Sequence, residues 1–278
     1  MPLVARSDSS FRKLLLTASG AVLALACGTS DGQLQSSGAL PDNMGGSNGN
    51  AGGSAGGDGG AQVSQPNPLG RLRCQAPPGM GTPSMTTEQA VTLLNALPKP
   101  TSVACFVEAL PRPLHINATN STFSAQPASS TTSPRVFIKL GQLWASVVID
   151  GDSSYLLEFG YRPTADAMTS IKGELRFPLN AAIPASAPYD RVRGGTNTSC
   201  GLCHFNESRA AGIDFATAYD SIAFRPRPES HVDVGLLQAE SASCRWDLDG
   251  HRCEMLSAIF DGGTVLEAPF PESMATFF

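Results

Sequence analysis

A glycine-rich segment limits how much of this chain can fold. Residues 28–70 contain no lysine, no arginine and no aromatic residue, and their middle reads GGSNGNAGGSAGGDGGA. Such a composition buries too little apolar surface to offset the entropy lost on ordering. A glycine-rich structural repeat is the alternative, but no period holds along the segment. We therefore interpret residues 27–70 as a disordered tether that begins at Cys27, and we expect a folded region of about 71–278, long enough for a sizeable core.

The first 26 residues have the pattern of a secretory signal. Arg6, Arg12 and Lys13 precede an apolar run from Leu14 to Ala26. A basic start, an apolar stretch of this length and small residues at its end are typical of export signals, and the run is too short to span a bilayer as a helix. We expect residues 1–26 to be removed from the mature chain.

The end of the signal resembles the bacterial lipobox, in the residues Ala24-Leu25-Ala26-Cys27-Gly28. Ala24 departs from the leucine preferred at the first position. The resemblance implies cleavage before Cys27 and lipidation of its thiol, which would anchor the chain to a bacterial membrane in the cell envelope, facing the periplasm or the cell surface. The alternative is ordinary cleavage at an A-x-A site, with Cys27 left as a thiol.

The charge of the mature chain narrows its partners. Without residues 1–26 the chain has 16 Lys and Arg residues and 23 Asp and Glu residues, a net charge of −7. An acidic chain of this kind is unsuited to binding nucleic acid, and its charge does not attract it to anionic lipid. Membrane association is therefore expected through the lipid on Cys27 alone.

Hydrophobic periodicity predicts an α+β fold in two parts. The N-terminal half, residues 71–190, is predicted to be a small mixed α+β domain rich in antiparallel strands, with no assigned role. Residues 191–278 are predicted to form a second half that is mostly helix and loop. A capping box at Thr86 and Gln89 is expected to start the first helix. The helices are predicted at 86–97, 103–110, 232–241 and 254–260, and the strands at 114–118, 136–140, 143–150, 155–160 and 170–179.

The strongest chemical signal is the motif Cys200-Gly201-Leu202-Cys203-His204. Cys-x-x-Cys-His is the attachment signature of c-type haem. Two intervening residues place both thiols on one turn, beside the two vinyl groups of a porphyrin. The next residue, His204, can then offer a ring nitrogen to the iron.

The motif resembles those of the c-type cytochromes, strongly over these five residues and only loosely over 191–278. The resemblance implies one covalent haem c, with thioethers at Cys200 and Cys203 and His204 as the proximal iron ligand. The order of elements departs from the usual cytochrome, in which a helix lies well before the motif and another closes the chain. Here a loop leads into the motif, and only four residues follow Met274.

Three other interpretations of the motif compete. A thioredoxin-like CxxC is expected just after a buried strand, and Arg193–Ser199 has no such pattern. A zinc site needs four ligands, and the adjacent Cys203 and His204 are poor partners on one tetrahedral ion. A plain disulfide between Cys200 and Cys203 needs no histidine. Export supplies the compartment in which bacteria attach haem, so we favour haem.

The second axial ligand is expected to be Met274, because it resembles the methionine of the distal loop in c-type cytochromes. That loop often has proline where this chain has Ala275. Met255 is a rival, although methionine in an apolar helix is usually core filler. His231, His251 and an iron with an open sixth position are the remaining alternatives.

The other cysteines suggest disulfides. Of the seven cysteines, four are left after lipidation of Cys27 and haem attachment, and an exported chain commonly pairs them. Cys244 and Cys253 flank a short turn, which leaves Cys74 and Cys105 for each other. Crossed pairing or buried reduced thiols are the alternatives.

Three functions are consistent with a single haem. We favour single-electron transfer with a redox partner protein that the sequence does not identify. A haem-based sensor or ligand-binding lipoprotein is the first alternative, and a haem enzyme such as a peroxidase is the second. The chain has no second CxxCH, which excludes a diheme peroxidase arrangement within it. No acid–base constellation stands out near the motif, so no catalytic residue is predicted.

Overall fold

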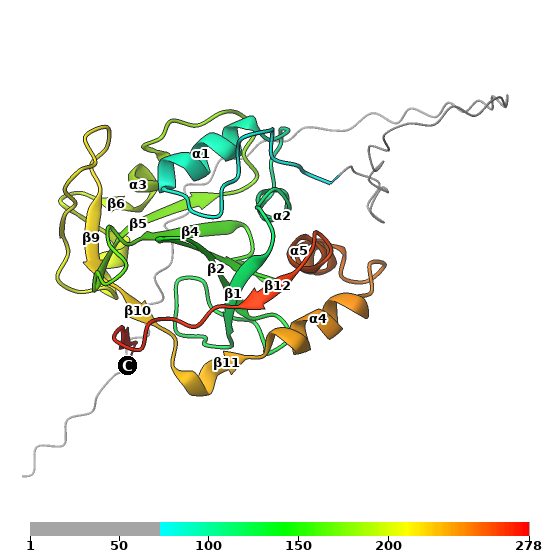
Figure 1. Cartoon of the computed structure of the whole chain (residues 1–278). Helices are drawn as coiled ribbons and strands as arrows, with labels where there is room; N and C mark the ends of the chain where they lie inside the picture. Colours follow the sequence, from blue (N-terminus) through cyan, green and yellow to red (C-terminus); the bar gives the residue numbers. More distant parts are fainter. Residues whose placement is uncertain (1–72, 278) are drawn as a thin grey trace, which may run out of the picture.

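The structure, a computed structural model, describes residues 73–277, and a large mixed β-sheet lies at its centre (Figure 1). The predicted signal peptide, Cys27 and the tether lie outside the described residues. The described part contains a sheet of nine strands in the order β11-β1-β2-β3-β4-β5-β9-β8, with β12 paired to β1 beside β11. Two further two-stranded sheets join β10 to β13 and β6 to β7.

The strands differ greatly in length, and the five longest follow one another in the chain as β1 to β5. The strands are β1 Leu114–Thr119, β2 Arg135–Leu140, β3 Leu143–Val148, β4 Leu156–Tyr161, β5 Thr169–Arg176, β6 Arg193–Gly194, β7 Asn197–Thr198, β8 Ser208–Arg209, β9 Tyr219–Ile222, β10 Phe224–Arg225, β11 His231–Val232, β12 Val265–Glu267 and β13 Ala275–Thr276.

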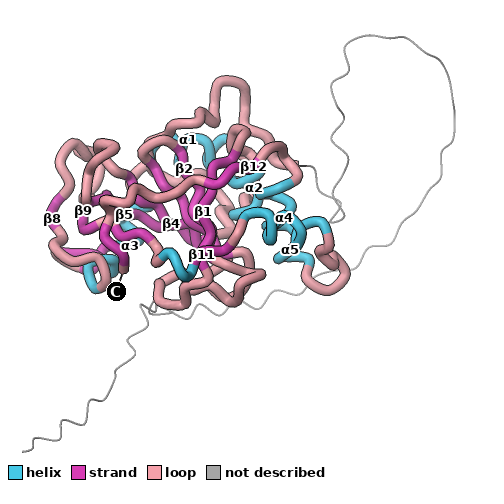
Figure 2. Tube along the Cα trace, turned by 60° about the horizontal axis from the view of Figure 1, so that its bottom comes forward, coloured by secondary structure: helices cyan, strands magenta, loops and turns pink. Residues whose placement is uncertain are grey.

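The helices lie around this sheet. Residues 73–277 form five α-helices: α1 Thr87–Ala96, α2 Val103–Glu108, α3 Ala187–Val192, α4 Val234–Ala242 and α5 Gly250–Phe260. Figure 2 shows α2, α4 and α5 grouped at one end of the molecule and α3 at the other, near β8 and β9. None of the helices in this described part is long and apolar enough to cross a membrane.

Local sequence signals explain where several elements begin and turn. Thr86 and Gln89 form the predicted capping box at the start of α1, which satisfies backbone N–H groups that the helix leaves unpaired. Strands β1 to β5 form the antiparallel meander that the alternating pattern predicts. Between β3 and β4 the chain turns at Gly151, whose φ of +93° suits glycine.

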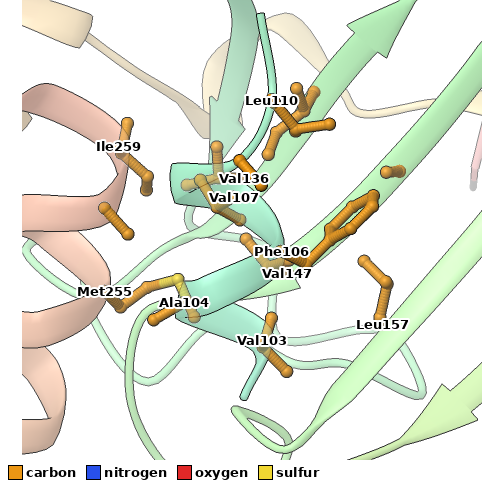
Figure 3. Packing of buried hydrophobic residues seen from close by; sticks show 14 of the residues in the cluster. Val103, Ala104, Phe106, Val107, Leu110, Val136, Val147, Leu157, Met255 and Ile259 are labelled. Atoms are coloured by element: carbon orange, nitrogen blue, oxygen red, sulfur yellow. The ribbon is translucent and has the colours of Figure 1, made fainter. Parts of the chain in front are cut away.

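One face of the meander carries the main core. Val136 on β2, Val147 on β3 and Leu157 on β4 are fully buried on this face. The short helix α2 lies between these strands and α5, and Phe106 of α2 is also fully buried (Figure 3). Burial of each such side chain contributes roughly 1.5–3 kcal/mol, so this layer of sheet, α2 and α5 is the main apolar source of stability.

Two disulfides reinforce this layer, and both predicted pairings are confirmed. Cys74 is bonded to Cys105 of α2, and Cys244 is bonded to Cys253 of α5. The first ties the start of the described residues to the core, and the second joins α5 to the residues that follow α4. Crossed pairing is thereby excluded in the structure.

The predicted fold class is wrong for the C-terminal half. The described residues form a mostly β fold, and the half expected to be helical supplies β8, β9, β11 and β12 to the nine-stranded sheet. The two helices predicted there do form, as α4 and α5. The strands were missed because they contain only two to four residues, which is too short for a period-2 pattern to be recognised.

Candidate functional site

The face of the meander opposite the core lines a cavity of about 90 Å³, here called the central cavity. Because successive side chains of a strand point to opposite faces, Arg135 and Phe137 project away from buried Val136. The paired strands continue this face: Phe137 lies opposite Ser146 of β3, and Gly160 of β4 lies opposite Lys172 of β5. The sheet thus supplies a largely polar floor to the central cavity.

Segments from the C-terminal half cover this floor. His204, Phe224, Phe270 and Met274 all line the central cavity. Phe270 stacks on Trp144 of β3, with ring centroids 4.1 Å apart and an interplanar angle of 16°. In Figure 1 the red C-terminal segment runs from β12 to β10 below the sheet. The covering side chains are mostly aromatic or apolar, in contrast to the floor.

The motif Cys200–His204 forms a single tight turn. Residues Ser199–Leu202 are a 3₁₀ helix, and the backbone N–H of His204 donates to the carbonyl of Cys200 at 2.8 Å. Glu207 holds the turn, since its carboxylate accepts from the backbone N–H of Thr198 at 2.7 Å. A Cβ at Gly201 would meet the same carboxylate at 3.1 Å, so the turn favours glycine between the two cysteines.

His204 is oriented by its Nδ1 atom. Nδ1 donates to the carbonyl of Ile222 at 2.8 Å, which leaves Nε2 as the nitrogen available for a metal. Burial, together with the positive charge of Lys172, lowers the pKa of His204 to about 3. The imidazole is therefore neutral at physiological pH, the state in which histidine binds metal ions. A backbone carbonyl on the other ring nitrogen is the usual second contact of a metal-binding histidine.

The two motif cysteines lie outside both disulfides and are half-buried. Burial, with the nearby negative charge of Glu158, raises the pKa of the Cys200 thiol to about 12. Cys200 is therefore a protonated thiol at neutral pH and a poor nucleophile by itself. This environment does not suit a thioredoxin-like exchange site, which depends on a lowered thiol pKa.

Met274 is the one predicted distal ligand that the structure places in the central cavity with His204. It is 4% exposed, and its backbone carbonyl accepts from Arg225 Nε at 2.9 Å. Pairing of β13 with β10 holds the segment that follows it.

The three rivals of Met274 lie elsewhere. Met255 is fully buried in the main core. His231 is exposed, and its Nε2 lies 3.0 Å from Glu267 Oε1. His251 is exposed too, and its Nε2 is 2.8 Å from Ser154 Oγ. None of these three side chains, all of them among the described residues, lines the central cavity.

Four charged side chains of the central cavity were not predicted from the sequence: Arg135, Glu158, Arg162 and Lys172. Arg135 Nη2 pairs with Glu158 Oε2 at 2.5 Å. Burial lowers the pKa of Lys172 to about 8, yet this pKa keeps most of the Lys172 amines charged at pH 7. The alternation of apolar and polar residues in the strand predicted at 170–179 indicated a polar face, but it gave no indication that charged side chains of several strands meet there.

The residues at the motif have the chemistry that a c-type haem requires. Two thiols on one turn, a neutral histidine with Nε2 available and a methionine at the same cavity are the groups that hold such a haem. The central cavity is smaller than the roughly 300–1,000 Å³ of pockets that enclose drug-sized ligands. A porphyrin therefore needs more space than the central cavity offers in this structure.

Among the described residues 73–277, no three His, Cys, Asp or Glu side chains lie close enough together to hold a metal ion.

Comparisons with known proteins add no family assignment. No family model matches the chain, and neither a curated protein nor a solved structure matches it.

Proposed function

We propose that Cys200, Cys203 and His204 hold one covalently attached haem c and that the chain carries single electrons in the bacterial cell envelope. The observation that supports this most directly is the shared lining of the central cavity by His204 and Met274. In a haem protein these two side chains would be the residues that hold the iron.

Several residues near the motif would each have a separate role in holding the haem. Cys200 and Cys203 would hold the porphyrin through thioether bonds, and the Ile222 carbonyl would keep the His204 ring turned with Nε2 outward. Two aromatic rings would restrict access of water to the His204 ring. The ring of Phe224 lies 5.4 Å from it and that of Phe277 lies 6.2 Å from it. A bound haem iron supplies reversible one-electron exchange, and a methionine ligand raises its potential.

The predicted tether gives this activity a location. A lipid on Cys27 and the predicted tether of residues 27–70 would confine the folded part to a shell near the membrane. Confinement raises the effective concentration of the haem for partners in the same membrane. Electron exchange with a redox protein there requires no substrate chemistry by the chain itself.

Haem attachment is tested by co-expression with cytochrome c maturation factors and a haem-peroxidase stain of a denaturing gel. We expect the wild-type band to stain and the Cys200→Ser/Cys203→Ser variant to lose the stain. The matched control is Cys74→Ser/Cys105→Ser, which removes two bridged cysteines and should keep the stain. A wild-type band without stain, or a stain that survives loss of both motif cysteines, would contradict the proposal.

Electron transfer is tested on the loaded protein by a redox titration followed in the visible spectrum. We expect one reversible transition that fits a single electron. Rapid turnover of hydrogen peroxide by the same preparation would instead favour the enzyme alternative.

A further inference from the structure

The floor of the central cavity holds more positive than negative charge. Arg135, Arg162 and Lys172 line it, and Glu158 is the carboxylate among its lining residues. Glu158 is already paired with Arg135 at 2.5 Å. Two cations, Arg162 and Lys172, are therefore left without a carboxylate in the lining.

Arg162 is the more unusual of the two. It is 5% exposed, and its Nη2 atom is buried without a hydrogen-bond partner among the described residues. Its Nε donates to the carbonyl of Ala167 at 2.9 Å. Asp166 is exposed, and its carboxylate accepts from Thr164 Oγ1 at 2.7 Å. Within residues 73–277, no ion pair joins Arg162 to a carboxylate.

Lys172 has hydrogen-bond partners but no ion pair, and the negative charges of Glu158 and Asp220 act on it only from beyond ion-pair distance. Its Nζ donates to Ser170 Oγ and, at 3.3 Å, to the carbonyl of Ile222. The ion pairs of the described residues do not include Lys172. Arg135 adds a second unsatisfied atom to the group, since its buried Nε also has no partner among the described residues.

Buried cations without a paired carboxylate are costly, and native structures satisfy nearly all buried donors. Water would satisfy the hydrogen bonds but would leave the charge uncompensated. An anion satisfies both requirements, and the planar guanidinium fork matches the two oxygens of a carboxylate or oxyanion. A cavity of about 90 Å³ has room for several water molecules at roughly 10–15 Å³ each, and so for an anion of four or five heavy atoms.

We propose that the central cavity is a binding site for a small free carboxylate or oxyanion, held by Arg162 and Lys172 and completed by Arg135. This site goes beyond the proposed electron transfer and does not depend on it, because none of the three cations is a haem ligand. It places a small anion at the same cavity as His204 and Met274. A haem propionate offers the same chemistry, so the test separates the two sources.

The probe is acetate, with neutral acetamide of the same size as its control, and binding is measured by calorimetry at low ionic strength and pH 7. The full-length mature chain is used in a haem-free form, Cys200→Ser/Cys203→Ser, and in the form loaded by maturation factors. We expect acetate to bind both forms and acetamide to bind at least tenfold more weakly. This comparison can be made on the haem-free form even if haem attachment fails.

Variants assign the binding to the cavity. Arg162→Gln and Lys172→Met should each weaken acetate binding at least tenfold, and Arg162→Lys should cause a smaller loss because it keeps the charge but not the fork. Arg176→Met is the matched control: it removes an exposed cation from β5 and should leave acetate affinity unchanged. Circular dichroism verifies that each variant folds. If the Arg162 variants do not fold, the acetate affinity of Lys172→Met tests the site.

Several outcomes would overturn the site. These are equal affinity for acetate and acetamide, affinity unchanged in Lys172→Met, and no acetate binding to either form. Acetate binding to the haem-free form alone would show that a haem propionate fills the cavity, and the proposal of a free anion would then be wrong.

Discussion

Met274 lines the same cavity as His204, although the two lie far apart in the chain. Two contacts join the segment that contains Met274 to the segment that orients His204. Arg225, three residues after the Ile222 carbonyl that orients His204, donates from Nε to the Met274 carbonyl. The strand that follows Met274, β13, pairs with β10, which contains Arg225. The same short stretch of chain therefore positions both candidate axial ligands.

Removal of the Met274 thioether should open the iron of the loaded protein. We expect Met274→Ala to bind carbon monoxide rapidly in the reduced form and to lose the far-red sulfur-to-iron band of the oxidised form, whereas wild type binds slowly or not at all. Met255→Leu is the control, because Met255 is buried in the main core. It should leave both spectra unchanged, with a stability loss below about 1.5 kcal/mol. Fast binding in wild type would exclude Met274 as the ligand.

Lys172→Met should stabilise the fold at neutral pH. Burial lowers the pKa of Lys172 from 10.5 to about 8, so between these values the unfolded chain binds more protons and wild-type stability rises with pH. Below pH 8 the full cost, on the order of 3 kcal/mol, opposes folding. Loss of the hydrogen bonds to Ser170 and Ile222 offsets about 1–2 kcal/mol of the gain.

Urea unfolding at pH 7 and pH 10.5 measures how the difference in stability between Lys172→Met and wild type depends on pH. The advantage of Lys172→Met over wild type should be about 1–2 kcal/mol at pH 7 and should vanish or reverse at pH 10.5. Lys139→Met, which removes an exposed lysine of β2, is the matched control for loss of a lysine from the sheet. An advantage of Lys172→Met that grows with pH would contradict the assigned shift. If Lys172→Met is more stable than wild type but binds acetate more weakly, the result also fits a lysine that serves binding at a cost in stability.

The two disulfides should differ in their contribution to stability. Their sequence separations are 31 for Cys74–Cys105 and 9 for Cys244–Cys253. On the chain-entropy account, closing these loops contributes about 3.7 and about 2.6 kcal/mol. We expect Cys74→Ala/Cys105→Ala to lower the free energy of unfolding more than Cys244→Ala/Cys253→Ala in urea titrations. The reverse order would show that local packing at the bridges outweighs loop entropy.

Cys27→Ser should release the protein from membranes. The lipobox resemblance predicts that wild type sediments with the membrane fraction and incorporates labelled palmitate, and that the variant does neither. Ser30 lies in the same segment, and Ser30→Ala is a suitable control that should stay membrane-bound. Wild type found free of the membrane after signal removal would count against lipidation.

Local patterns predicted much of the N-terminal half and both disulfide pairings correctly. The capping box at Thr86, the five strands of the meander and both disulfide pairings follow from residues close together in the chain or from a small number of cysteines. In the C-terminal half the same reasoning found α4 and α5 but missed the strands that complete the sheet. Pairs such as β8 with β9 and β11 with β1 involve two residues each, so their backbone pairing leaves no periodic mark.

The sequence by itself determined the motif of Cys200, Cys203 and His204, the meander of five strands and the pairing of four cysteines, because each depends on spacing along the chain. Only the tertiary structure decided which of four candidate ligands lies with His204, and that Arg162 and Lys172 meet at one cavity. Alternation states which face of a strand a side chain occupies, but which segment covers that face depends on long-range packing. A charged side chain on a strand costs little when water covers it, whereas a charge that the fold encloses has to be compensated by a partner.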